Sequence, residues 1–145
     1  MKFMLYAKIK SFGELARIDK PIGIYLLLWP SLLGFLLAGT NNILNINDFI
    51  IVIIGTILVR SCGCVINDIS DYKIDKLVYR TAGRPLATGA LTILEAWMFF
   101  IVLGLLSILL LLLTNTLTIK IATFFAFLIC IYPLTKRFCS APQFI

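Results

Sequence analysis

The chain has 145 residues, of which 61% are hydrophobic and only 14% are charged. A soluble domain of this length is usually about half apolar, so this composition indicates a membrane protein. The net charge of +6 would also suit a nucleic-acid-binding protein, but membrane proteins collect Lys and Arg in their cytoplasmic loops, and we prefer that explanation and expect no nucleic-acid partner. The chain contains no histidine, which excludes histidine general bases and histidine metal ligands.

Four apolar runs follow one another along the chain. They lie near residues 22–39, 49–66, 96–113 and 117–134. Each is roughly long enough to cross a hydrocarbon core of about 30 Å as a helix. Backbone groups inside a bilayer must satisfy their own hydrogen bonds, and the runs lack the alternation of a membrane β-barrel, so helices are expected. The predicted fold class is all-α, a polytopic membrane bundle of about four transmembrane helices in one domain covering residues 1–145.

The connecting segments indicate how this bundle is oriented. Lys and Arg residues precede the first run and follow the second and fourth runs, whereas the other two connections contain neither. Basic loops stay on the cytoplasmic side of a membrane. The pattern therefore predicts a multi-pass protein with both termini in the cytoplasm.

Carboxylates gather where the second run ends, in the stretch CGCVINDISDYKID at residues 62–75. We expect the second helix to continue through this stretch. On a helix of about 100° per residue, one arc of about 100° then contains Arg60, Asn67, Asp68, Asp71 and Asp75. Three carboxylates on one stripe repel one another unless a cation lies among them, and hard oxygen ligands together with phosphate oxygens suit Mg²⁺. The alternative is a solvated helix end with scattered charges.

Basic residues accompany the carboxylates on both sides. Arg60 lies inside the second run, where a charge costs about 2.5–3.5 kcal/mol or more, so it should face a cavity or a partner; snorkelling or helix packing is the alternative. Lys73, Lys76, Arg80 and Arg84 follow the run. Arginine presents a fork of donors that matches phosphate oxygens. Together these residues would suit a Mg²⁺-bridged diphosphate.

The segment GCVINDISDYKIDKLVYRTAGRPLATGAL, residues 63–91, resembles the first aspartate-rich region of the UbiA family of intramembrane prenyltransferases. The family pattern N-D-x-x-D-x-x-x-D falls on Asn67, Asp68, Asp71 and Asp75. RIDKPIGIYLLLWPSLLG, from Arg17, resembles the family's entry to its first helix, and YPLTKRFCSAPQ, from Tyr132, resembles the segment after its fourth. Within the family, these two segments are similar to the 4-hydroxybenzoate polyprenyltransferase branch of ubiquinone biosynthesis.

The resemblance implies a membrane enzyme, expected in the bacterial inner membrane, that uses Mg²⁺ and transfers a polyprenyl group from a polyprenyl diphosphate to 4-hydroxybenzoate. It implies that Asp71 and Asp75 are catalytic, and that Arg80 and Arg84 order the cytoplasmic loop over the site. The implied Mg²⁺ ligands are Asn67, Asp68, Asp71 and Asp75. The implied substrate-binding residues are Arg17, Arg60, Asn67, Asp68, Tyr132, Lys136 and Arg137.

The chain departs from the family pattern in length. Family members are about twice as long, with eight or nine helices, so this chain is expected to form the N-terminal half of such a fold and to expose helix faces meant for the other half. They also carry a second aspartate-rich motif, whereas Asp75 is the last aspartate here. The alternatives to an enzyme that is active by itself are an inactive truncated fragment, a half that pairs with a second chain, a homodimer that supplies a second copy of the first motif, and a non-catalytic lipid-binding or scaffold protein of the membrane.

Overall fold

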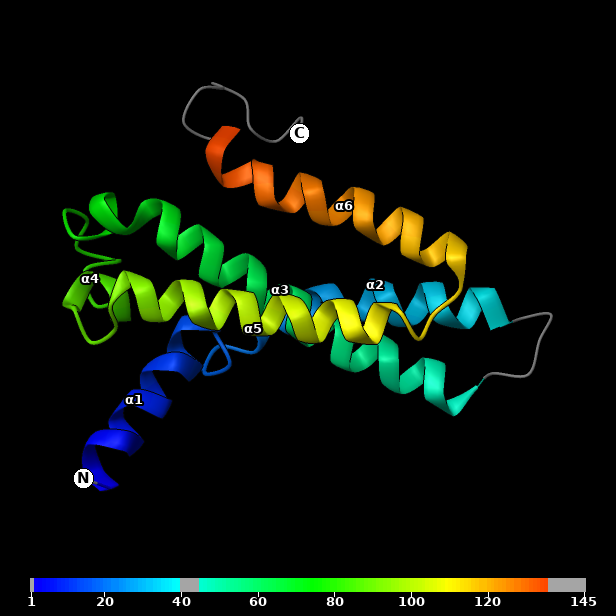
Figure 1. Ribbon diagram of the computed structural model, residues 1–145, viewed down its shortest axis with the longest axis horizontal. Helices are drawn as coiled ribbons and strands as arrows, with labels where there is room; N and C mark the ends of the chain where they lie inside the picture. Colours follow the sequence, from blue (N-terminus) through cyan, green and yellow to red (C-terminus); the bar gives the residue numbers. More distant parts are fainter. Residues whose placement is uncertain (1, 40–44, 136–145) are drawn as a thin grey trace.

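The computed structural model describes residues 2–39 and 45–135, with side chains described for 6–39, 45–129 and 131. These residues form helices and no strand, which confirms the predicted all-α class (Figure 1). The elements are α1 (Lys2–Leu15), α2 (Ile22–Ala38), α3 (Ile46–Asp75), α4 (Pro85–Thr88), α5 (Ile93–Leu111) and α6 (Thr116–Thr135). As expected, α3 runs beyond its apolar part and includes all three aspartates of the motif.

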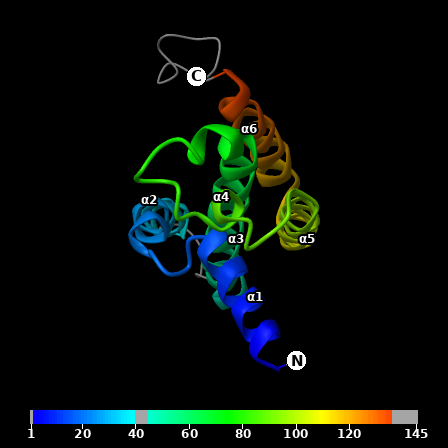
Figure 2. The same ribbon diagram turned by 90° about the vertical axis from the view of Figure 1, so that its left-hand side faces the viewer.

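Helix α3 is the centre of the molecule, because it packs against each of the other helices. Figure 2 shows α2 and α5 on opposite sides of it. Helices α3 and α5 are long and apolar enough to cross a membrane, while α2 and residues 116–129 form shorter apolar helices. Large apolar side chains on α2, α5 and α6 are exposed, as suits an apolar environment. Helices α2, α3, α5 and α6 overlap the four apolar runs of the sequence. How many of them span a membrane stays a prediction.

The first helix, α1, has no counterpart among the predicted spans. It packs against the start of α5, where Lys8 contacts Glu95 and the rings of Phe12 and Phe99 lie 5.0 Å apart. The start of α5 is itself well capped, because the Thr92 hydroxyl accepts a hydrogen bond from the Glu95 amide and the Glu95 carboxylate accepts one from the Thr92 amide. The contacts of Lys8 with Glu95 and of Phe12 with Phe99 place α1 beside the start of α5, at the end of the bundle where we expect the cytoplasmic ends of α3 and α5.

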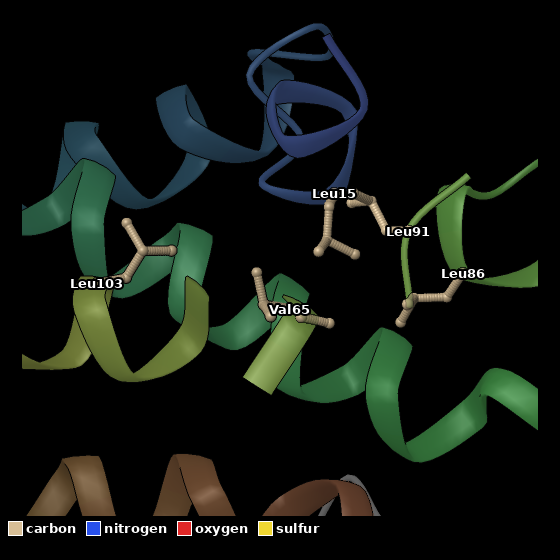
Figure 3. Packing of buried hydrophobic residues seen from close by; sticks show 6 residues of the cluster. Leu15, Val65, Leu86, Leu91 and Leu103 are labelled. Carbon is tan, nitrogen blue, oxygen red and sulfur yellow. The ribbon is translucent and has the colours of Figure 1, made fainter. Parts of the chain in front are cut away.

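A small apolar cluster joins these ends (Figure 3). Its members come from α1, α3, α4, α5 and the loop before α5, and none is more than 8% exposed. They are Leu15, Val65, Leu86, Leu91, Ala96 and Leu103. Each fully buried aliphatic side chain stabilises the fold by about 1.5–3 kcal/mol in an aqueous surrounding, so the cluster fixes the loops at this end of the bundle.

The turn after α1 has an unusual residue at its key position. The Ile18 amide donates to the Gly13 carbonyl at 3.0 Å and the Arg17 amide donates to the Glu14 carbonyl at 3.1 Å, which is the Schellman pattern of a helix end. This pattern needs a left-handed residue, and glycine is the usual choice. Here that residue is Arg17, with φ of 59°. This left-handed conformation is less stable by about 1–2 kcal/mol for an L-residue that carries a side chain.

We predict that Arg17→Gly unfolds less readily than Arg17→Ala, by about 1 kcal/mol, because both remove the guanidinium and only glycine relieves the backbone strain. Chemical denaturation in one detergent measures the difference. The matched pair Lys10→Gly and Lys10→Ala, at an exposed position inside α1, should show the reverse order, since glycine is unfavourable within a helix. If Arg17→Ala is as stable as Arg17→Gly or more stable, the backbone at this turn is not strained.

Candidate functional site

The loop between α3 and α4 carries Arg84 back toward α3. The Thr81 hydroxyl donates to the carbonyl oxygen of Asp75 at 3.1 Å, and the Arg84 amide donates to the Thr81 carbonyl at 3.0 Å. Arg84 is extended, with ψ of 147°, because Pro85 follows it and disfavours a helical conformation. Pro85 and Leu86 are buried, so the loop is anchored at both of its ends.

The carboxylate of Asp68 is the most deeply buried charged group near this loop, in a residue that is only 1% exposed. Its Oδ1 lies 3.2 Å from Nη2 of Arg17 and 3.1 Å from Nη1 of Arg84. The same Nη1 lies 2.6 Å from Oδ2 of Asp75, a residue that is 6% exposed. Arg84 therefore sits between two aspartates that are seven positions, or about two helical turns, apart on α3.

This ion-pair network is electrically balanced. A buried carboxylate loses its hydration, and the loss is repaid only when opposite charges and hydrogen bonds surround it. Asp68 and Asp75 contribute two negative charges, and Arg17 and Arg84 contribute two positive ones. Because the arginines come from two different loops, the network ties the turn after α1 and the loop before α4 to the same face of α3.

A pocket of about 610 Å³ opens beside the network. Its charged lining consists of four cationic side chains, Arg17, Lys20, Arg80 and Arg84, and three acidic ones, Glu14, Asp19 and Asp68. Thr81, Gly83 and Pro85 complete it. Arginine and lysine donors around a hollow of this kind can bind the oxygens of a phosphate or carboxylate.

The structure brings together some of the residues singled out in the sequence. Arg17, Asp68 and Asp75 meet in one network, and Arg84 ties its loop to α3 through that network, whereas Arg80 in the same loop is exposed. Asn67 and Asp71 lie half-buried on the same helix. The side chain of Tyr132, and Lys136 and Arg137 altogether, lie outside the described part of the chain.

Arg60 lies elsewhere, at the contact between α2 and α3. A Cβ atom placed on Gly23 would be only 2.6 Å from Nη2 of Arg60, so the guanidinium lies directly against this glycine. Arg60 shares an arc of α3 with the aspartates, as the helical period predicts. The period does not take account of the distance along the helix axis, and Arg60 lies eight residues before Asp68. Lys20 is a pocket residue that the sequence analysis missed, although it stands in the RIDKPIG segment quoted for Arg17.

The metal site remains a prediction. Among the residues that the structure describes, no three Asp, Glu or Cys side chains are grouped closely enough to hold a metal ion. The donor set still suits Mg²⁺, which is commonly held by one or two carboxylates together with ligand oxygens. Oδ2 of Asp68 is buried and accepts no hydrogen bond from the described residues, so this carboxylate has unused capacity as an acceptor or a ligand.

We predict that Arg84→Ala lowers the free energy of unfolding by about 2–4 kcal/mol, because it leaves Asp75 unpaired and Asp68 with one partner. Chemical denaturation in detergent measures this change, and limited proteolysis should show faster cleavage within residues 76–84. Arg80→Ala, in the same loop but exposed, is the control and should change stability by less than about 0.5 kcal/mol. Similar losses for both variants would contradict the special role of Arg84.

Comparison with known proteins supports the resemblance noted in the sequence. A model of the UbiA prenyltransferase family matches residues 27–145. The 4-hydroxybenzoate octaprenyltransferase of Shewanella loihica is 44% identical over 94% of this chain and 47% of its own length. The proteins of the same name from Saccharophagus degradans and Vesicomyosocius okutanii are 43% and 47% identical over 97% and 89% of this chain, and again over 47% of their own lengths.

No solved structure matches the chain. The chain spans about half the length of the curated relatives that it matches. The family model nevertheless covers most of the chain, including the aspartate motif on α3 and both arginine-bearing segments that follow it, Arg80 and Arg84. On this match and the described helical architecture, the chain belongs to the UbiA prenyltransferase family.

Proposed function

We propose that this chain takes part in the transfer of a polyprenyl group from a polyprenyl diphosphate to 4-hydroxybenzoate. The observation that carries the proposal is the pair of arginines, Arg17 and Arg84, which contact buried aspartates and line the pocket. The relatives' names supply the aromatic acceptor, 4-hydroxybenzoate, and an octaprenyl group as the group transferred. A diphosphate head in the pocket and an isoprenoid tail among apolar helices would suit such a donor.

The charged residues of the pocket would act on the leaving group. The bond between the allylic carbon and the diphosphate oxygen breaks, and its electron pair leaves with the diphosphate. Guanidinium and ammonium donors from Arg17, Lys20, Arg80 and Arg84 would stabilise that developing charge, because they are already positioned before the reaction begins. Mg²⁺, held by Asp71 and Asp75 with Asn67 in support, would add further positive charge beside the leaving group.

The allylic carbon then bonds to the ring carbon ortho to the phenol oxygen, and that ring carbon loses its proton. The reaction needs no histidine base, because the electrophile is highly reactive. An apolar surrounding excludes the water that would otherwise capture the allylic cation. The apolar faces of α3 and α5 provide such a surrounding.

We place the pocket on the cytoplasmic side of the bacterial inner membrane. The support for this placement is the positive-inside pattern, since the pocket lies at the end of α3 that leads into the basic loop containing Arg80 and Arg84. A water-soluble aromatic acid and a charged diphosphate head would then both reach the site from the cytoplasm.

The test is prenyl transfer to radiolabelled 4-hydroxybenzoate in membranes that contain this chain, with Mg²⁺ or with EDTA. We expect Mg²⁺-dependent product, and a loss of at least about 100-fold for Asp71→Asn or Asp75→Asn, because each removes a charge at the leaving group. Asp48→Asn, an exposed aspartate at the opposite end of α3, is the matched control and should retain full activity.

Two outcomes would each contradict a different part of the proposal. Absence of product from a chain shown to be inserted in the membrane would mean that the chain does not catalyse transfer by itself, and product restored by a second polypeptide would identify a shared site. Full activity of Asp71→Asn would remove the metal assignment while leaving the transfer reaction in place.

A further inference from the structure

We propose that Asp68 is a positioning residue whose carboxylate holds Arg17 and Arg84 in place to bind the diphosphate, and that it is not a Mg²⁺ ligand. This inference rests on the proposed function and gives one aspartate of the motif a different task from Asp71 and Asp75. It revises the ligand set that the family resemblance implied for Asp68.

The burial of Asp68 relative to its partners is the first support. Its side chain is 2% exposed, whereas the side chains of Arg17 and Arg84 are 29% and 22% exposed. All three line the pocket. A ligand entering the pocket would therefore meet the guanidinium groups more readily than the carboxylate behind them.

The geometry at a single oxygen atom is the second support. Arg17 and Arg84 both approach Oδ1 of Asp68, at 3.2 and 3.1 Å, although they belong to different loops. A guanidinium has five N–H donors, and the contacts with the aspartates engage Nη2 of Arg17 and Nη1 of Arg84. Within the described part of the chain, the other donors of each group contact no carboxylate and could bind phosphate oxygens, with Arg17 oriented by Asp68 and Arg84 oriented by Asp68 and Asp75 together.

The strained backbone at Arg17 is the third support. Glycine would occupy this left-handed position without strain, yet the chain has an arginine with φ of 59°. The backbone gains nothing from the larger residue, so the reason for it lies in the side chain. The contact of that side chain with Asp68 brings a positive charge from the turn after α1 to the pocket.

The experiment measures two affinities for the chain in lipid nanodiscs. One is the affinity for inorganic pyrophosphate in EDTA, and the other is the affinity for Mn²⁺, a spectroscopic substitute for Mg²⁺, measured by electron paramagnetic resonance. We expect Asp68→Asn to weaken pyrophosphate binding by about 10- to 100-fold and to weaken Mn²⁺ binding by a clearly smaller factor, because Asp68 contacts the arginines directly and would influence a metal at Asp75 only through Arg84. Asp48→Asn should change neither affinity.

A double-variant comparison tests whether Asp68 acts through Arg17. Arg17→Gly removes the guanidinium and also relieves the turn, so it should remain folded while losing pyrophosphate affinity. If both residues act as one unit, the double variant should bind pyrophosphate about as weakly as the weaker single variant, with losses that do not add. Additive losses would mean that Asp68 contributes independently of Arg17 and would overturn the inference.

Each remaining outcome has a clear meaning. A large loss of Mn²⁺ affinity in Asp68→Asn, with pyrophosphate binding in EDTA unchanged, would make Asp68 a metal ligand and overturn the inference. If Asp68→Asn does not fold, unchanged pyrophosphate affinity in the folded Arg17→Gly variant would overturn it instead. If the unaltered chain does not bind pyrophosphate at all, the proposed function and this inference both fail. If the unaltered chain binds pyrophosphate and Asp68→Asn binds it equally well, only the inference fails.

Discussion

The buried charge of Asp68 is the constraint on which the rest of this end of the molecule depends. An isolated carboxylate at this depth would cost several kcal/mol, so the fold must bring cations to it. They arrive from both directions along the chain: Arg17 from the turn before α2 and Arg84 from the loop after α3. A single charge on the central helix thereby determines how two loops run, and the pocket lies where they converge.

The apolar cluster and the ion-pair network reinforce each other because they use neighbouring residues. Leu15 precedes Arg17 by two positions, Val65 precedes Asp68 by three, and Leu86 follows Arg84 by two. Burying the leucines and the valine supplies favourable free energy, while the ion pairs specify which arrangement is reached. A fold that buried the same apolar residues with Arg84 turned away would remove the counter-ion of Asp75 and leave Asp68 with Arg17 alone.

Helix α3 connects two environments that a prenyl donor also connects. Its first part is apolar enough to cross a membrane, and its last turns carry the charged network. Exposed apolar side chains run along α2 and α5, and the charged pocket lies among the loops beside the last turns of α3. A ligand with a charged head and a long apolar tail has the same division, which is the physical link between this architecture and the family to which the chain belongs.

The sequence by itself determined what depends on near neighbours: the helical class, the extension of α3 through Asp75, and the angular grouping of its charged residues, all of which follow from composition and the period of the helix. Only the tertiary structure decided which of these residues meet. It placed Arg60 against Gly23, buried Asp68 beneath two arginines, and set Arg17 in a left-handed turn. Arg17 and Asp68 are 51 positions apart, and such a contact depends on how loops pack around a buried charge, which no local period records.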